Sequence, residues 1–177
     1  MRVLVTFALA AALAPGVSAR SHGTPPGPHA AIATRTIGFT RIFEECGDGY
    51  SKIVTLLQHP QDTTARQVLQ AITRLRRRCA RKAAALAGGD TSDFGRAARD
   101  AEGAIRAYRS SLVHLARYAR TQNLTELHAA QIGFLDASSR DLTAQREINA
   151  IRRGAGLAAL PLRDRASAAG MGTTTID

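Results

Sequence analysis

The sequence predicts an all-α protein, an antiparallel up-down four-helix bundle that is preceded by a cleaved N-terminal signal peptide. Three observations lead to this prediction. Apolar residues recur at steps of three and four along most of the chain, which is the period of an amphipathic helix. Helix-breaking residues divide this pattern into four stretches of similar length, and no long stretch alternates in polarity as a strand would. The first 19 residues have the composition of an export signal.

The export signal occupies residues 1–19. Arg2 supplies one positive charge, residues 3–14 form an apolar run, and Val17-Ser18-Ala19 is typical of a cleavage site. The run is too short to span a bilayer, and no second long apolar run follows it. We therefore expect cleavage after Ala19, no transmembrane segment in the mature chain, and a periplasmic or secreted location in a bacterium.

The mature chain is long enough for one domain with a real core. We expect a flexible, proline-rich leader over 20–29, a helical bundle over 30–156 and a loose tail over 157–177. The four helices are expected over 30–58, from a cap at Thr63 or Thr64 to 87, from a cap at Thr91 or Ser92 to 121, and over 124–153. The boundary at Gln122-Asn123 is the weakest signal, so the last two helices could also form one long kinked helix.

The two cysteines, Cys46 and Cys79, fall on the apolar stripes of the first and second predicted helices. Pairing these helices across their turn places the cysteines about 6 Å apart along the axis, which a small shift in the turn would close. In an oxidising compartment an even pair predicts one disulfide. It would stabilise the fold by about 3 kcal/mol. The alternative is two buried, inert thiols.

The chain carries a formal net charge of +10, and 22 of its 24 basic residues are arginine. Arginines gather on one side of the second and third predicted helices, which suggests binding to an anionic protein or envelope polymer. The candidate binding residues are Arg74, Arg77, Arg78, Arg81, Arg99, Arg106, Arg109 and Arg117. A solvated helix face in an arginine-rich proteome has the same pattern, and this alternative stays open. Nucleic acid fits less well because exposed aromatics that could stack on bases are nearly absent.

Arg76 differs from the other arginines because it falls inside the apolar arc of its helix. It either extends to the edge of the bundle or pairs inward with a carboxylate such as Glu44, Glu45 or Asp48.

The mature amino terminus would be Arg20-Ser21-His22. Its free amine, two backbone amides and imidazole form a four-nitrogen, square-planar ligand set that suits Cu(II) or Ni(II). The inner arc of the fourth predicted helix is unusually polar, and its polar residues are His128, Gln131, Ser138, Gln145 and Asn149. Such a helix either lies at the periphery, half in water, or lines a pocket for a small ligand.

The sequence contains no nucleophile elbow, phosphate loop or zinc-hydrolase motif, so we predict no catalytic residues. The resulting hypothesis is an exported, non-enzymatic binding or interaction protein of the bacterial cell envelope. The alternative is a periplasmic carrier of Cu, Ni or a small ligand.

Overall fold

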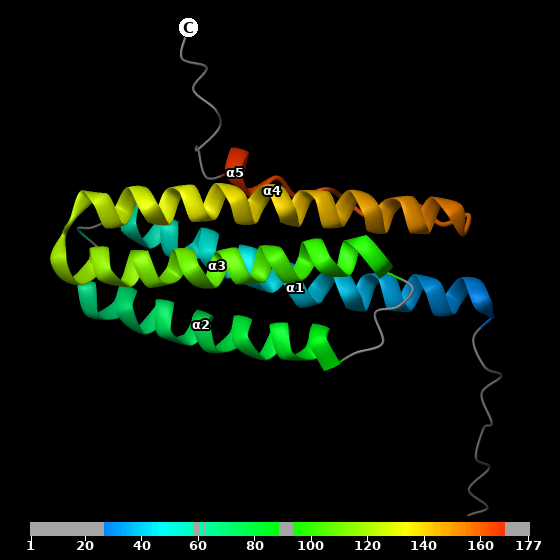
Figure 1. Ribbon diagram of the computed structural model, residues 1–177, viewed down its shortest axis with the longest axis horizontal. Helices are drawn as coiled ribbons and strands as arrows, with labels where there is room; N and C mark the ends of the chain where they lie inside the picture. Colours follow the sequence, from blue (N-terminus) through cyan, green and yellow to red (C-terminus); the bar gives the residue numbers. More distant parts are fainter. Residues whose placement is uncertain (1–26, 59–60, 62, 89–93, 169–177) are drawn as a thin grey trace, which may run out of the picture.

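The computed structural model describes residues 27–58, 61, 63–88 and 94–168. These residues form four long helices and one short helix: α1 (Pro28–Gln58), α2 (Ala65–Gly88), α3 (Gly95–Thr121), α4 (Leu124–Gly154) and α5 (Arg165–Ala168). Figure 1 shows the long helices packed along one another, with successive helices running in opposite directions. The described chain is thus all-helical, and its packing is compatible with the predicted bundle. The predicted signal peptide, 1–19, lies outside the described residues.

Capping explains where α1 and α2 begin. The α1 helix starts at Pro28, two residues earlier than expected, and proline suits the first helical turn because its missing N–H needs no partner there. At α2 the Thr64 N–H donates to Gln67 Oε1 (2.8 Å), while the Gln67 N–H donates to Thr64 Oγ1 (3.3 Å). This reciprocal pair is a capping box. Thr64, one of the two predicted caps, therefore starts the helix. Thr91 and Ser92 lie outside the described residues.

The chain breaks between α3 and α4 at Gln122-Asn123. Gln122 adopts the left-handed conformation (φ 55°), and its N–H donates to the Tyr118 carbonyl (2.8 Å). The Asn123 side chain then caps α4 by accepting a hydrogen bond from the Thr125 N–H (2.9 Å). The third and fourth predicted helices are therefore separate, with the boundary where the sequence placed it.

A buried disulfide joins Cys46 of α1 to Cys79 of α2, which confirms the predicted pairing. The Cα atoms of the two cysteines are 5.6 Å apart. One turn along, a Cβ at Gly49 would overlap the Leu75 side chain, so glycine permits the close approach of the two helices.

Buried aromatic rings connect α1 to α3 and α4. The ring of Tyr50 stacks on that of Phe134, with centroids 4.6 Å apart, and Tyr108 packs at a tilt against both. The Tyr50 hydroxyl also forms a hydrogen bond with Ser111 Oγ (2.6 Å). This cluster therefore combines apolar packing with a satisfied polar group in the middle of the core.

The segment after α4 departs from the loose tail that the sequence predicted over 157–177. Residues 157–168 turn back and run along α4 to α5 (Figure 1). Residues 169–177 lie outside the described residues.

Candidate functional site

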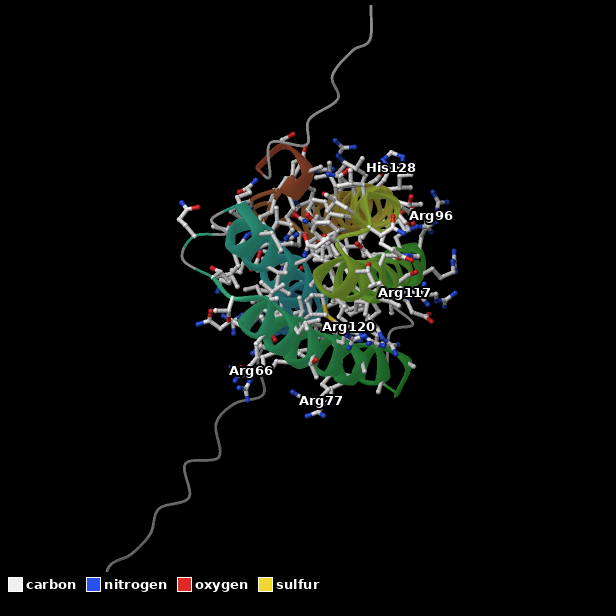
Figure 2. The ribbon with its side chains drawn as sticks, turned by 90° about the vertical axis from the view of Figure 1, so that its left-hand side faces the viewer. Arg66, Arg77, Arg96, Arg117, Arg120 and His128 are labelled. Atoms are coloured by element: carbon white, nitrogen blue, oxygen red, sulfur yellow. A yellow bond between two sulfur atoms is a disulfide. The ribbon has the colours of Figure 1, made fainter. Side chains whose placement is uncertain are left out.

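The outer face of α2 carries several arginines close together. Arg74, Arg77, Arg78 and Arg81 are all exposed, and none of them forms an ion pair with another described residue. The α2 sequence contains no acidic residue that could neutralise them locally. Figure 2 shows Arg77 pointing away from the bundle into solvent. The positive charge of this face is therefore not neutralised by acidic side chains of the described residues.

The arginines predicted on α3 are also exposed, but some have local partners. Arg106 pairs with Glu102 one turn earlier (2.8 Å), and Arg117 lies 3.7 Å from Glu126 of α4. The other two predicted residues, Arg99 and Arg109, are exposed and form no ion pair with another described residue. The α3 face is consequently less positive than the α2 face.

Arg76 is exposed and does not pair inward. The three carboxylates considered as its partners are engaged by other cations. Glu45 pairs with Lys82 (2.9 Å), and Glu44 and Asp48 pair with arginines from the segment that follows α4.

The polar arc predicted on the fourth helix divides into an exposed half and a buried half. His128 and Gln131, near the start of α4, are exposed, and Gln131 lines a cavity at this end of the bundle. Ser138, Gln145 and Asn149, further along, are buried. The two predicted alternatives therefore each describe one half of the arc: the first half lies at the periphery, and the second half is buried.

The buried half of the arc holds the segment after α4 by hydrogen bonds from side chains to backbone. The Asn149 amide accepts from the Leu160 N–H (2.7 Å) and donates to the Leu160 carbonyl (2.8 Å). Gln145 accepts from the Arg163 N–H (2.8 Å) and approaches its carbonyl at 3.4 Å. An amide side chain carries one donor and one acceptor side, so it satisfies both backbone groups of one residue, as a neighbouring strand would.

Two further contacts extend this attachment. Ser138 Oγ accepts from the Ala166 N–H (3.1 Å). The guanidinium group of Arg152 donates to the Ala158 carbonyl and to Thr36 Oγ1 of α1, both at 2.7 Å. The segment from 157 to 168 is therefore fastened along α4 and joined to α1, which explains why it is not the loose tail expected.

A buried ion pair lies at the end of the fastened segment. The Arg165 guanidinium donates to Asp141 Oδ2 (2.5 Å) and to Asp48 Oδ1 (2.9 Å), and both Arg165 and Asp141 are almost fully buried. Tyr108 and Gln145 also donate to the Asp141 carboxylate (3.2 and 2.8 Å). Burial raises the pKa of the Asp141 carboxyl, while Arg165 and the two hydrogen bonds act in the opposite direction.

Glycine makes room for this ion pair. A Cβ at Gly47 of α1 would overlap the Arg165 guanidinium group, so only glycine lets the side chain pass over the helix at this point.

Sequence reasoning missed Asp141, Tyr108 and Arg165. The available signal was the spacing of Ser138, Asp141 and Gln145, which continues every three or four residues and places one polar stripe on a single side of α4. The polar groups of this network form their hydrogen bonds with one another. The network therefore has the arrangement of a structural contact that holds the segment after α4 in place, rather than that of a reactive centre.

The metal predictions are not tested by this geometry. The Arg20-Ser21-His22 ligand set lies outside the described residues, so binding of Cu(II) or Ni(II) there stays a prediction. Within the described part of the chain, no group of three or more His, Cys, Asp or Glu side chains is arranged to hold a metal ion. His114 Nδ1 forms a hydrogen bond with Glu126 Oε2 (2.7 Å).

No helix in the described ranges is both long and apolar enough to cross a membrane. The disulfide is compatible with a compartment outside the cytoplasm.

No protein-family model matches the chain, and comparisons with curated proteins and with solved structures return no match.

Proposed function

We propose that this chain is an exported, non-enzymatic binding protein of the bacterial cell envelope, which docks onto an anionic protein or envelope polymer through its cationic helix faces. The observation that carries the proposal is the α2 face, where four exposed arginines have no ion-pair partner among the described residues. The predicted signal peptide and the disulfide support an oxidising, extracytoplasmic setting.

The α2 face has the features of a docking surface for a polyanion. Its arginines project from a regular helix, so their spacing is fixed by the scaffold. Guanidinium groups bind carboxylates and phosphates in a bidentate manner, and unpaired ones need not break an internal ion pair first. The exposed arginines of α3 add charge beside this face, and the local acids weaken their contribution.

The test compares two variants that lose the same amount of charge. The first replaces the four arginines of α2 by glutamine, R74Q/R77Q/R78Q/R81Q. The control replaces four exposed arginines of α1 and α4, R41Q/R140Q/R146Q/R153Q. Poly-L-glutamate is the probe, and binding is measured by calorimetry at several salt concentrations.

We expect the α2 variant to bind poly-L-glutamate about tenfold more weakly at low salt, with a shallower dependence on salt. The control variant should bind nearly as well as the unmodified protein. An equal loss in both variants would mean that only total charge matters, and no binding at low salt would contradict the proposal entirely.

A further inference from the structure

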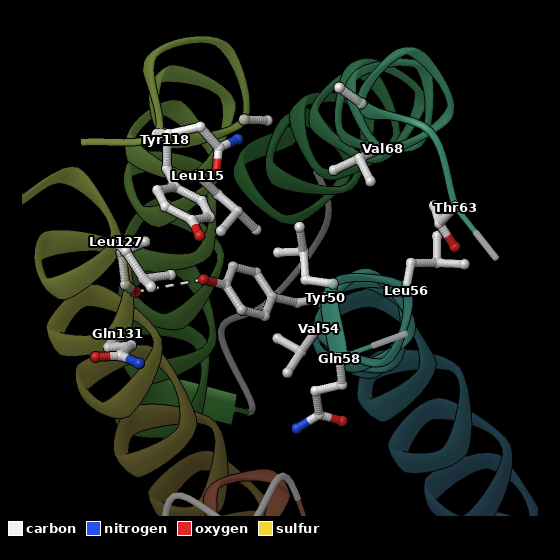
Figure 3. Close-up of a pocket in the computed structure, with 15 residues that line it drawn as sticks. Tyr50, Val54, Leu56, Gln58, Thr63, Val68, Leu115, Tyr118, Leu127 and Gln131 are labelled. Atoms are coloured by element: carbon white, nitrogen blue, oxygen red, sulfur yellow. Dashed lines mark hydrogen bonds between the residues drawn. The ribbon is translucent and has the colours of Figure 1, made fainter. Parts of the chain in front are cut away.

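The hollows of the described chain differ in the charge of their walls. A cavity of about 450 Å³ lies between the four long helices (Figure 3), and the described residues of its wall are apolar or neutral polar. A shallow hollow on the outer face of α2 is lined instead by three arginines and three uncharged residues: Arg66, Arg74, Arg77, Leu69, Gln70 and Thr73. Burying an anion without a counterion is costly, so the hollow on α2 is the better place for one.

This hollow belongs to a longer stripe of arginines along α2, called here the arginine stripe. Its members are exposed and form no ion pair with another described residue; they are Arg66, Arg74, Arg77, Arg78 and Arg81. At about 100° per residue they fall within an arc of about 120°, on the side of α2 opposite the buried residues Val68, Ile72 and Leu75. From its first to its last arginine the stripe rises about 22 Å along the helix. Figure 2 shows Arg66 and Arg77 both projecting from α2 into solvent.

The outer face of α2 lacks the apolar side chains that hold folded protein partners. None of the large hydrophobic residues that are exposed on the described chain lies on α2. The cores of protein–protein interfaces are rich in buried aromatic and aliphatic groups, and charged pairs at the rim add little. A flexible polyanion needs no such core, because its affinity comes from successive ionic contacts and from the release of its counterions. The arginine stripe therefore favours an extended chain over a folded acidic partner.

We propose that the arginine stripe binds an extended, flexible polyanion that lies along the axis of α2, with its anionic groups at the hollow beside Arg66 and at the cluster from Arg74 to Arg81. This inference rests on the proposed function and narrows its partner from an anionic protein or polymer to a linear polymer. A guanidinium group binds carboxylate and phosphate oxygens alike, so the length and flexibility of the chain decide the fit. The chain must extend over about 22 Å to reach both ends of the stripe.

The test compares two variants that each lose one exposed arginine of α2. R66Q removes the far end of the stripe. R76Q is the matched control, because Arg76 is also exposed and lies close to the cluster along the helix, but about 80° outside the arc of the stripe. The ligands are triglutamate and decaglutamate, whose extended lengths are at most about 11 Å and about 36 Å. Binding is measured by calorimetry at low salt, and circular dichroism verifies that both variants remain helical.

We expect decaglutamate to bind the unmodified protein about tenfold more tightly than triglutamate, because only the longer ligand reaches both ends of the stripe. R66Q should weaken decaglutamate binding about threefold and leave triglutamate binding unchanged, because the short ligand occupies the cluster from Arg74 to Arg81 alone. R76Q should change neither affinity by more than about 1.5-fold.

The outcomes separate this inference from the proposed function. If neither ligand bound at low salt, the proposed function would fail and this inference with it. If decaglutamate bound but R76Q weakened its binding as much as R66Q, the arginines would act as a diffuse patch, as they would toward a folded acidic protein, and only this inference would be overturned. Equal weakening of both ligands by R66Q would overturn it in the same way.

Discussion

The two helices α2 and α4 lie on opposite sides of the molecule, and they use polar residues in opposite ways (Figure 1). The exposed arginines Arg74, Arg77, Arg78 and Arg81 of α2 have no ion-pair partner in the described chain. On α4, by contrast, Asp141, Gln145, Asn149 and Arg152 are buried and satisfied by the segment that follows the helix or by neighbouring side chains.

This difference separates polar residues with a structural role from those available to a partner. A buried charge is costly unless it is paired, so the α4 groups must keep their internal partners for the fold to be stable. An exposed arginine in water carries no such requirement, and it can exchange water for an external anion at little structural cost. The α2 face is therefore the better candidate for recognition, and the buried half of the α4 arc is the better candidate for stability.

The largest effect that would test this distinction is expected from R165A. The substitution leaves Asp141 buried without its main counterion, and breaking a buried pair in this way costs about 3–5 kcal/mol. The free energy of unfolding, measured by urea denaturation, should fall by about this amount.

R163A is the matched control for R165A. The Arg163 side chain is 53% exposed and pairs with Glu44 and Asp48 at the surface, whereas Arg165 is 4% exposed. Its loss should cost about 0–1 kcal/mol. If the two variants had the same free energy of unfolding, the buried ion pair of Arg165 would not be what holds the segment over 157–168 against the bundle.

A smaller effect is expected from N149A. The variant removes both hydrogen bonds to the Leu160 backbone, and leaving these groups without a partner costs about 1–3 kcal/mol. Amide hydrogen exchange at Leu160 should also become faster, because its N–H donates to Asn149 in the intact protein. Q131A, on the exposed half of the same arc, should change the stability by less than about 0.5 kcal/mol. Unchanged exchange at Leu160 in N149A would contradict the side-chain fastening of this segment.

The sequence predicted those features that follow from helical periodicity. The apolar stripes indicated which faces of α1 and α2 meet, and together with the oxidising compartment this favoured the Cys46–Cys79 disulfide that the structure contains. The break at Gln122-Asn123 was also visible, because these residues interrupt the apolar pattern between two helices.

The partners of the α4 arc were not predictable in the same way. The segment over 157–164 is irregular, and hydrogen bonds from side chains to its backbone leave no periodic pattern in the sequence. Arg163 and Arg165 are the same residue type two positions apart, yet only the second is buried. Arg76, which the sequence placed either at the edge of the bundle or paired inward, is exposed. The guanidinium group that pairs with Asp48 and Asp141 comes instead from Arg165, in a segment whose position depends on the folded α1–α4 surface.

The smallest effect on stability is expected for R74Q/R77Q/R78Q/R81Q. These arginines lie three or four residues apart on α2, where like charges repel weakly, so their loss should change the stability by less than about 0.5 kcal/mol, with a slight gain at low salt. Thermal unfolding at low salt and near 1 M salt measures this, because at 1 M the screening length is only about 3 Å and the gain should disappear. A loss of more than about 1 kcal/mol would instead mean that these arginines support the fold. The contrast between α2 and α4 would then no longer identify α2 as the face available to a partner.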